Sequence, residues 1–447
     1  MRPLALSLAQ AALLAAAAAA PPTPPALLMR RYPLHSAAAA ATACGDGSRA
    51  ALFFRNCSAN WDSHSGFDYC ANITDDWLLV FGSDAPGALL NSSGGGGGAP
   101  GPPDAAGALC YSAASCAARD ATLRSSASLP ASAFPGGLVS PFAEQNANLY
   151  KAHTVVVPYC SSDLFACNAS GFFGRAALDA ALEQLFVAGA RGVPLEEGPT
   201  MAHADRVVLA GGAGVMARLD EIAEQLRGLK RAATRNASAA LDVFGLCDGC
   251  LLLDVAPPPG AAAGCTTDAD CPPREALARL HAIAPLARPR WCAEPDATLW
   301  RCYLAPQLSA ALAAAATPVL VSLALFDERQ LRANGVADAA APTPAEREWA
   351  EAVFAPAARA ALAPHRYSFS AACAAPHALA TDGEGYYHEL VRFVDPSGNE
   401  LNASLSQALP SFLDCAAPGG PGPSQFGRYG DTCATFACGG FCTAPAR

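Results

Sequence analysis

Apolar residues along this chain form short continuous runs that alternate with longer segments of helical periodicity. Continuous apolar runs are typical of parallel strands that are buried on both faces. Such runs occupy residues 77–81, 154–158, 206–210, 251–254 and 318–325. Helical spacing of apolar residues extends over residues 174–190, 215–229 and 344–362. The alternation predicts an α/β fold with a mostly parallel central sheet and helices on both faces.

The first residues of the chain have the layout of a secretory signal. Arg2 precedes a run of Leu and Ala over residues 4–20, and small residues stand before Pro21. A short positive region followed by an apolar stretch and small residues is typical of a cleavable signal peptide. A transmembrane anchor is the alternative, and the shortness of the alanine-dominated stretch favours cleavage. We therefore expect a signal peptide over residues 1–20, a Pro/Ala-rich leader over 21–43, and a secreted or cell-surface protein.

Cysteine usage indicates the same compartment. The chain has 18 cysteines, and several are closely spaced: Cys110/Cys116, Cys160/Cys167, Cys247/Cys250, Cys265/Cys271 and Cys292/Cys302. In an oxidising compartment such pairs are typical of disulfides. The spacing of Cys247 and Cys250 also fits a zinc or redox site, but no second pair of this kind and no His-x-x-x-His complements it. We expect disulfides, and no metal or cofactor.

Sequons and charge constrain the partners. Asn-x-Ser/Thr sequons occur at Asn56, Asn72, Asn91, Asn168, Asn236 and Asn402. A secreted chain would expose several of them for glycosylation. The net charge of −10 argues against nucleic acid and anionic membranes as partners. No later apolar run is long enough for stable membrane insertion.

Two stretches lie outside the predicted core, which extends over residues 44–415. Residues 91–106 are rich in Gly, Pro and Ser and predict a surface insertion. Residues 416–447 combine a Gly/Pro linker with a tail that contains Cys433, Cys438 and Cys442. Three cysteines cannot all pair with one another, so we expect one of them to bond to the body of the protein or to another chain.

The order of the candidate functional residues is that of an α/β-hydrolase. A strand at Val207–Leu209 leads into residues 210–214 and then into a helix. Hydrolases of this class carry the nucleophilic serine at such a strand–turn–helix junction. Asp327 follows a later apolar strand, and His377 comes after it. Nucleophile, acid and histidine occur in this order in α/β-hydrolases.

Five motifs extend this interpretation: Val157-Pro-Tyr-Cys-Ser-Ser-Asp163, Leu209-Ala-Gly211, Asp248-Gly-x-x-Leu-Leu-Asp254, Leu325-Phe-Asp-Glu-x-Gln-Leu331, and Cys373 with His377. Together they resemble the pectin acetylesterase family, with the Notum-type carboxylesterases as the closer branch. The resemblance extends over about residues 44–415. It implies a disulfide-stapled α/β-hydrolase fold and a secreted serine esterase. Such enzymes remove acetyl groups from plant polysaccharide or a fatty acyl group from a secreted signalling protein.

The resemblance assigns roles position by position. Asp327 matches the triad acid and His377 the triad base. The family's nucleophile turn reads Gly-x-Ser-Ala-Gly, and residues 210–214 match it, so Gly212 stands where the serine is expected. The positions implied for the oxyanion hole or for substrate binding are Gly82, Ser83 and Ala213. A carboxylate at Asp84 would oppose a developing oxyanion there.

Glycine at position 212 separates the fold from the chemistry. We expect a strained backbone at this turn, which glycine accepts without penalty, so the fold would persist. The covalent step would not, because glycine offers no atom that can attack an acyl carbon. Loss of the nucleophile in a triad hydrolase lowers turnover by about 10⁶.

Simpler structural roles are also open to these residues. Asp327 could cap a helix or hold a buried network. Ser161 and Ser162 are expected to position a loop rather than to act as nucleophiles. Asp248 and Asp254 are expected to orient backbone near the site, and Asp242 and Glu221 to be solvated charges. Family resemblance and proximity in sequence also imply four disulfides: Cys110–Cys116, Cys265–Cys271, Cys292–Cys302 and Cys373–Cys415.

Three hypotheses for function follow. The first is a pseudoenzyme that keeps the fold and binds a carbohydrate or an acylated ligand, such as an acetylated polysaccharide or an acylated secreted protein. The second is an active carboxylic ester hydrolase that uses a non-standard nucleophile or a water molecule activated by His377. The third is a structural extracellular glycoprotein, for which the cysteine-rich tail and the density of sequons argue.

Overall fold

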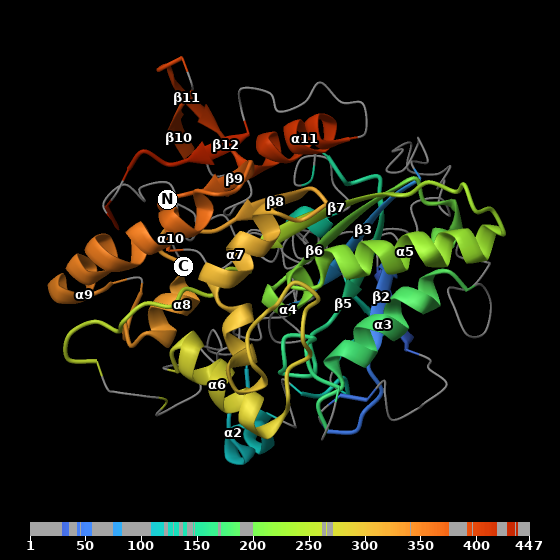
Figure 1. The fold of residues 1–447 in the computed structure, drawn as a ribbon, viewed down its shortest axis with the longest axis horizontal. Helices are drawn as coiled ribbons and strands as arrows, with labels where there is room; N and C mark the ends of the chain where they lie inside the picture. The colour runs from blue at the N-terminus through green and yellow to red at the C-terminus, as the bar shows by residue number, and fades with distance from the viewer. Residues whose placement is uncertain are drawn as a thin grey trace, which may run out of the picture.

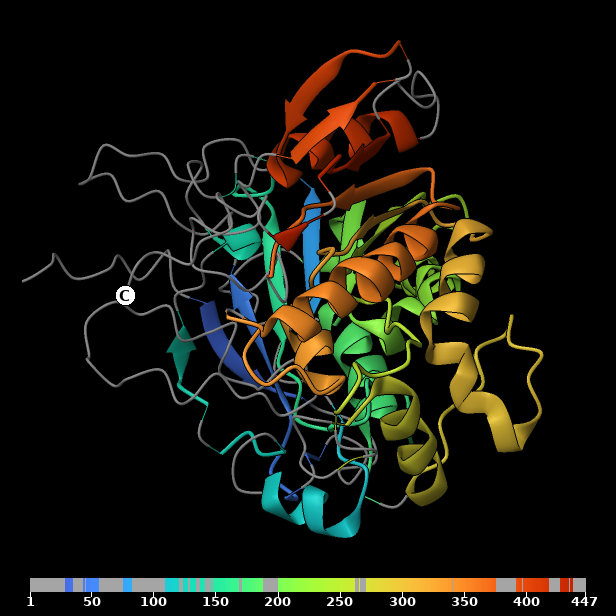
Figure 2. The same ribbon diagram turned by 90° about the vertical axis from the view of Figure 1, so that its left-hand side faces the viewer.

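A ten-stranded sheet forms the centre of the molecule (Figures 1 and 2). The computed structural model describes residues 29–34, 43–55 without 45, 75–82, most of 109–187, 200–261, 265, 271–374 without 340, 391–417 without 396, and 427–436 without 434. The strands of this sheet are β1 (Met29–Pro33), β2 (Ala51–Arg55), β3 (Asp76–Phe81), β4 (Ser132–Ala133), β5 (His153–Val157), β6 (Arg206–Gly211), β7 (Asp242–Asp248), β8 (Val319–Ser322), β9 (Tyr367–Ser370) and β12 (Arg428–Gly430). A separate hairpin pairs β10 (Val391–Val394) with β11 (Glu400–Ala403).

The strand order is β12-β9-β8-β7-β6-β3-β5-β2-β1-β4. Every pair from β12 to β5 is parallel, whereas β2, β1 and β4 join the other edge antiparallel. Parallel neighbours need crossover connections, and these supply the helices that cover the sheet. The predicted mostly parallel α/β sheet is therefore confirmed.

Helices cover both faces of the sheet, but unequally. They are α2 (Ala113–Arg119), α3 (Gly174–Leu185), α4 (Ala213–Met216), α5 (Leu219–Thr234), α6 (Pro273–Ile283), α7 (Ala305–Ala313), α8 (Glu328–Ala333), α9 (Pro344–Trp349), the π-helical turn η7 (Ala350–Phe354), α10 (Ala355–Leu362) and α11 (Leu405–Ala416). Short 3₁₀ turns are η3 (Gly137–Val139), η5 (Met201–His203) and η6 (Asp296–Tyr303). Figure 2 shows most of the helices gathered on one side of the sheet.

Two hydrophobic cores result from the alternation of side chains along the strands. Leu79 and Leu209 belong to the larger core, which also contains buried residues of α3, α5, α6, α7 and α10. Leu78 and Val208, one position earlier, belong to the second core together with Phe412 of α11. Successive side chains of a strand point to opposite faces. The continuous apolar runs seen in the sequence therefore reflect strands that are covered on both faces.

One predicted strand is misplaced. Residues 251–254 form a loop, and the strand at this place in the sheet is β7, which ends at Asp248. Gly245 interrupts the apolar run of β7, and a Cβ there would lie 2.8 Å from the Leu219 side chain of α5. Glycine thus lets α5 pack close to the strand. The loop residue Leu253 is buried although it is in no strand, and its N–H donates to the Gln330 side chain at 2.7 Å.

The predicted helices over 215–229 and 344–362 both form with an irregularity. The first is two helices, α4 and α5, which meet at Ala217 and Arg218. The second runs from α9 through the π-helical turn η7 into α10. Thr343 starts it with a capping box to Glu346, which satisfies backbone N–H groups at the helix start.

The sheet extends beyond both boundaries that we predicted for the domain. Strand β1 lies within the segment expected to be a leader and pairs with β2. Strand β12 lies within the expected tail and pairs in parallel with β9. The insertion predicted at 91–106 lies outside the described residues.

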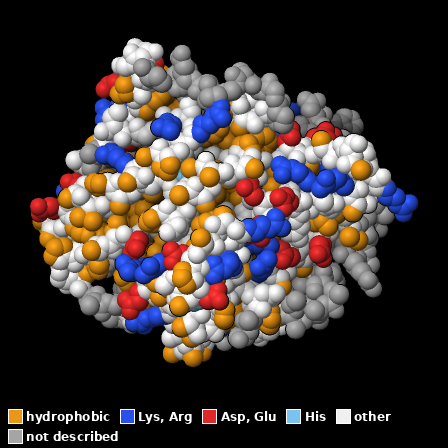
Figure 3. Space-filling view, in the orientation of Figure 1, with side chains coloured by type: hydrophobic (Ala, Val, Ile, Leu, Met, Phe, Trp, Pro, Cys, Tyr) orange, Lys and Arg blue, Asp and Glu red, His pale blue; other side chains and the backbone are white. Residues whose placement is uncertain are grey.

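Charges on the face shown in Figure 3 are mixed in sign. Lys and Arg side chains lie near Asp and Glu side chains along α5 and the neighbouring loops. Ion pairs on the described surface include Arg290 with Glu224 at 2.5 Å and Arg279 with Glu275 at 2.5 Å. No helix of the described ranges combines the length and apolar character that crossing a membrane requires.

Candidate active-site region

Those assigned positions that the structure describes lie at the carboxyl edge of the parallel strands. The register places Phe81 of β3 beside Gly211 of β6, and Gly211 beside Cys247 of β7. Asp248 is in turn beside Ser322, the last residue of β8. Ligand sites of open parallel sheets form where chains leave this edge. The loops after β3, β6 and β8 carry Gly82, Gly212 and Asp327, so they emerge at one edge of the sheet.

Gly212 occupies the turn between β6 and α4. Its backbone is extended, with φ −80° and ψ −170°, and its carbonyl accepts the Met216 N–H at 3.0 Å. Any residue can adopt this conformation, so our expectation of a strained turn is wrong. The residue is half-buried, and no side chain from this position reaches into the site. Ala213 begins α4, so its N–H has no acceptor within the helix.

A strained loop fixes the position of α4. Ser162, Leu164 and Phe165 all have φ values between 53° and 60°, a region that non-glycine residues rarely adopt. A Cβ at Gly214 would overlap the carbonyl oxygen of Leu164. Glycine at position 214 therefore lets helix and loop backbones meet in direct contact.

Asp163 holds this loop in place. Its carboxylate accepts the N–H groups of Phe165 at 3.0 Å, Cys167 at 3.3 Å and Gly174 at 3.0 Å. Burial raises the pKa of Asp163, and its hydrogen bonds oppose that rise. Ser161 and Ser162 are both buried in the loop, and Arg119 donates to the Ser162 hydroxyl at 3.2 Å. The contact of Ser162 fits the loop-positioning role that we expected, and Ser161 is buried in the same loop.

Asp327 is buried and starts α8. One carboxylate oxygen, Oδ1, accepts the N–H groups of Arg329 at 3.0 Å and Gln330 at 3.1 Å. The other, Oδ2, accepts Nε2 of Gln330 at 3.1 Å. Asp327 therefore caps a helix and belongs to a buried network, as its simpler interpretation predicted. Three donors also orient the carboxylate at the sheet edge, which is what a triad acid requires.

Gln330 is a site residue whose role we did not predict from the sequence. Besides Asp327, its Nε2 donates to the Leu251 carbonyl at 3.1 Å, and its Oε1 accepts the Leu253 N–H at 2.7 Å. Its amide thus joins the carboxylate to the loop after β7. The signal was available, because Gln330 lies three residues after Asp327 within a quoted motif, and residues at this spacing are neighbours on a helix.

The remaining assigned positions are described only in part. His377, Ser83 and Asp84 lie outside the described residues. Gly82 is buried, and its N–H donates to the Val157 carbonyl at 3.1 Å. That hydrogen bond continues the pairing of β3 with β5, so the Gly82 amide is committed to the sheet.

Acidic residues near the site divide by exposure. Asp248 is buried at the end of β7, whereas Asp254 is exposed and pairs with Arg274 at 3.6 Å. The expectation that Glu221 is a solvated charge is wrong. Its carboxylate accepts the Arg290 N–H at 3.0 Å and pairs with Arg218 at 3.4 Å, so it joins α5 to a neighbouring loop.

One Ser–His hydrogen bond occurs among the described residues, between Ser309 Oγ and His365 Nε2 at 3.0 Å. Both residues are buried; Ser309 lies on α7 and His365 follows the end of α10. The serine hydroxyl donates its single proton to the Ala361 carbonyl at 2.6 Å. His365 must therefore donate to the serine, which is the reverse of what a general base does. This pair is structural and offers no substitute nucleophile.

Disulfides in the described residues are Cys44–Cys160, Cys110–Cys116, Cys247–Cys250, Cys265–Cys271 and Cys292–Cys302. Three of the four pairings implied by resemblance are therefore formed. The spacing of Cys247 and Cys250 belongs to a disulfide at the end of β7. The close pair Cys160/Cys167 does not bond, because Cys160 pairs with Cys44 across the fold. Cys167 is a buried free thiol that contacts the Ala284 carbonyl at 3.4 Å.

The predicted Cys373–Cys415 disulfide is wrong. Cys373 is disulfide-bonded, whereas Cys415 on α11 is a free thiol. The Cys415 thiol lies beside Tyr367, at the start of β9, where it contributes to the raised pKa of that phenol after burial. Cys373 lies beyond the other end of β9. The three strand steps from Tyr367 to Ser370, at about 3.3 Å each, already cover about 10 Å, more than the span of a disulfide, and Cys373 follows three residues later.

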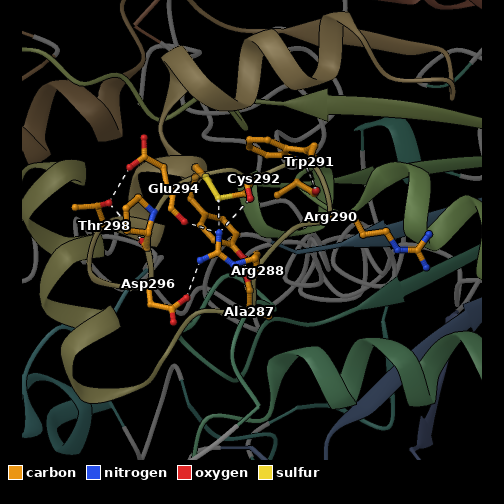
Figure 4. The surroundings of a disulfide bond; sticks show 12 residues. Ala287, Arg288, Arg290, Trp291, Cys292, Glu294, Asp296 and Thr298 are labelled. Carbon is orange, nitrogen blue, oxygen red and sulfur yellow. Dashed lines mark hydrogen bonds and ion pairs between the residues drawn. A yellow bond between two sulfur atoms is a disulfide. The ribbon is translucent and has the colours of Figure 1, made fainter.

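Figure 4 shows the surroundings of the Cys292–Cys302 disulfide, where Trp291 contacts the end of α4. Arg288 crosses the loop to the Asp296 carboxylate at 2.7 Å and donates to the Cys292 carbonyl at 3.1 Å. The indole N–H of Trp291 donates to the carbonyl of Ala217, at the end of α4, at 2.8 Å. Helix α4 is therefore held between this loop and the strained loop that contains Asp163.

The sequons that can be placed are exposed. Asn168, Asn236 and Asn402 are all exposed, on two loops and on β11. Asn56, Asn72 and Asn91 lie outside the described residues. Within the described ranges, no group of three or more His, Cys, Asp or Glu side chains is placed to hold a metal ion.

Comparison with known proteins finds relatives in sequence, a similar fold and a matching family. The curated relatives include the palmitoleoyl-protein carboxylesterase Notum of Drosophila melanogaster, 29% identical over 242 residues, and that of Homo sapiens, 28% identical over 243 residues. Each alignment covers 51% of this chain, but only 33% and 44% of the respective relative, so the match spans less than half of their length.

A solved structure of the Wnt deacylase Notum from Drosophila is similar in fold, with a TM-score of 0.64 and 22% identity over 93% of this chain and 99% of that one. The sequence profile of the family described as Pectinacetylesterase matches residues 105–372, which is more than half of the 447 residues. On this match, together with the α/β fold, the chain belongs to the pectinacetylesterase family.

Proposed function

We propose that this protein is a pectinacetylesterase-family member that has lost its nucleophile and binds an acylated or acetylated ligand without turning it over. The observation that carries the proposal is Gly212 in the turn between β6 and α4. A serine esterase of this fold places its attacking oxygen at that turn. Glycine has no such atom, and the mechanism has no covalent step without it.

The supporting parts of the site argue for binding rather than for a decayed fold. Asp327 keeps three hydrogen-bond donors on its carboxylate. Gly214 keeps the close contact with the Leu164 carbonyl. A site that retains its walls and loses one reacting atom can still hold a ligand, because binding and the chemical step use different interactions.

The class of ligand follows from the relatives. The relatives are named as palmitoleoyl-protein carboxylesterases and as a Wnt deacylase, and the matching family is described as Pectinacetylesterase. Both reactions take an ester of a carboxylic acid with a sugar or protein hydroxyl. We propose an acylated secreted protein or an acetylated polysaccharide as the ligand of this chain.

An active carboxylic ester hydrolase is the second candidate. The buried carboxylate of Asp327, held as a triad acid would be, favours it. It requires a nucleophile other than residue 212, such as water activated by His377. The Ser309–His365 pair does not supply one, because the serine donates elsewhere and both residues are buried.

Ester hydrolysis by the purified, full-length protein separates the two candidates. We expect no turnover of p-nitrophenyl acetate or octanoate above the rate of the His377→Ala variant. Gly212→Ser is expected to create turnover, because φ −80° and ψ −170° suit serine as well as glycine. Gly212→Ala is the matched control, since it adds the same Cβ without the hydroxyl. Wild-type turnover that disappears in His377→Ala would overturn the pseudoenzyme proposal.

We further propose an extracellular location for the protein. Five disulfides occur in the described residues, and disulfides persist in oxidising compartments. Expression in a eukaryotic secretory host and recovery of the protein from the medium would support this location. Recovery only from the cytosol, with free thiols, would contradict it.

A further inference from the structure

The described segment after the Gly/Pro linker packs against the rest of the fold. Residues 428–433, 435 and 436, which we call the clasp, begin with strand β12 at the edge of the sheet beside β9 (Figure 1). After β12, the N–H of Asp431 continues the pairing to the Ser370 carbonyl at 2.9 Å. The clasp then leaves the sheet at its carboxyl edge, the edge where Asp327 lies.

The clasp contacts the chain on both sides of residues 375–390, the part of the sequence that contains His377. On one side, Asp431 Oδ2 accepts the N–H of Ala372 at 3.3 Å. On the other side, the N–H of Thr432 donates to the Arg392 carbonyl of β10 at 2.8 Å. Two consecutive clasp residues thus tie together the described chain before and after that segment.

The clasp also reaches the acid side of the site. The ring of Phe436 packs on the ring of Phe326 with centroids 4.2 Å apart. Phe326 is fully buried and directly precedes Asp327. Its N–H donates to the Cys373 carbonyl at 3.2 Å, and the N–H of Leu325 donates to the Ala371 carbonyl at 2.8 Å. The clasp therefore presses on the junction where the acid-bearing chain meets the chain that leads to His377.

The helix formed by α9, η7 and α10 makes hydrogen bonds to the clasp. Arg359 of α10 donates to the carbonyls of Asp431 at 3.2 Å and Cys433 at 2.5 Å. Glu351 of η7 accepts the N–H of Phe436 at 2.9 Å. Cys433 is in addition disulfide-bonded. Charged and covalent contacts of this kind hold a segment more firmly than packing alone.

We propose that the clasp is a positioning element of the site, in which Asp431 and Phe436 keep the Asp327 junction and the chain leading to His377 in register. The functional meaning of this inference rests on the proposed roles of Asp327 and His377, whereas the contacts of the clasp do not depend on those roles. A ligand in the site would then depend on residues about 100 positions away from the acid in sequence.

Hydrogen exchange on the full-length protein tests the clasp directly. The amides of Leu325 and Phe326 are the readout, because their acceptors belong to the 371–373 chain and not to the clasp. In Asp431→Ala and Phe436→Ala, we expect these two amides to exchange at least about tenfold faster, because each variant removes contacts that oppose local opening. Asp414→Ala, which changes an exposed aspartate on α11, is the matched control. Phe436→Tyr keeps the ring and is expected to restore slow exchange.

A second readout reports on the histidine itself. In protein labelled at histidine, the His377 resonance is identified by its loss in His377→Ala. We expect it to move in Asp431→Ala and to stay unchanged in Asp414→Ala. Equal exchange in the two aspartate variants would overturn the proposal, as would faster exchange spread equally over β6 and β7. Failure of Gly212→Ser to gain turnover would count against the proposed function alone, because neither readout depends on ester hydrolysis.

Discussion

Gly214→Ala tests how the turn after β6 is built. Gly214 lies in α4, and an added Cβ would overlap the carbonyl oxygen of Leu164, with the carbonyl carbon only 2.8 Å away. These are backbone atoms, so no side-chain rotation can relieve the overlap. Leu164 has φ 60° in a loop that Asp163 holds by three hydrogen bonds. The loop must therefore shift as a unit, or α4 must move away from it.

The expected size of the effect comes from two opposing contributions. Replacing glycine by alanine inside a helix stabilises a protein by about 0.5–1 kcal/mol. Overpacking in a filled interior costs about 1–3 kcal/mol and sometimes more. Because the overlap here is with backbone, we expect the upper end, a net loss of at least about 2 kcal/mol. Gly228 in α5 has no atom within 4 Å of the same added Cβ. Gly228→Ala should therefore stabilise by about 0.5–1 kcal/mol.

Urea unfolding with the disulfides intact, followed by tryptophan fluorescence, measures both variants against the wild type. We expect changes of opposite sign in the free energy of unfolding for the two glycines, although each change adds one methyl group to a helix. If Gly214→Ala unfolds within about 0.5 kcal/mol of the wild type, the loop is not in contact with α4 as described. If Gly228→Ala is the more destabilising of the two, helix propensity and the space around the added Cβ do not determine the change in stability.

Three further outcomes follow from buried and exposed polar groups. Burial, followed by the charge of a nearby arginine, lowers the pKa of His153 and of His365 to about 4. In the unfolded chain the two histidines bind a proton near pH 6.5, so the free energy of unfolding should fall as pH drops from 6.5 to 4, by up to about 1.4 kcal/mol per pH unit for each histidine. A free energy of unfolding, measured with urea, that does not change over this pH range would contradict this. Gln330→Leu should destabilise by about 2–4 kcal/mol in the same assay, because it leaves the Leu253 N–H and the Leu251 carbonyl without their side-chain partner; a loss below about 0.5 kcal/mol would contradict it. Asn236 is exposed beyond α5 and its Oδ1 accepts the Ser238 N–H at 2.9 Å, so Ser238→Ala should remove one glycan from the secreted protein by intact mass, and an unchanged mass would show that the sequon is unused.

The sequence predicted most of the fold because its signals are local. The run at Trp77–Phe81 is apolar at every position, and both faces of β3 are buried, so pattern and structure agree. The run at residues 251–254 gave the same signal for a different reason. Leu251 and Leu253 are buried in a docked loop whose polar contact, Gln330, is almost 80 residues away. Local pattern cannot distinguish a residue buried by strand pairing from one buried by such long-range docking.

The supports of the site could be predicted less well than its candidate residues. Asp327 and Gly212 stand out from the sequence because residue type and chain order bear directly on the reaction. The strain at Ser162, Leu164 and Phe165 gives no signal of its own, since these residue types do not favour φ above zero. The disulfide prediction at Cys373 failed for a related reason. Proximity along the chain says little about which end of β9 a helix will lie against.

Stability and chemistry at this site are governed by separate parts of the structure. The turn at Gly212 is fixed by backbone contacts, through Gly214 against Leu164 on one side and the Ala217 carbonyl to Trp291 on the other. None of these contacts involves a side chain at position 212. Exchange of serine for glycine would therefore leave folding almost untouched while removing the attacking atom. It follows that a well-folded protein is no indication of activity here, and that turnover measured in the wild type, in His377→Ala and in Gly212→Ser decides between an enzyme and a binding protein.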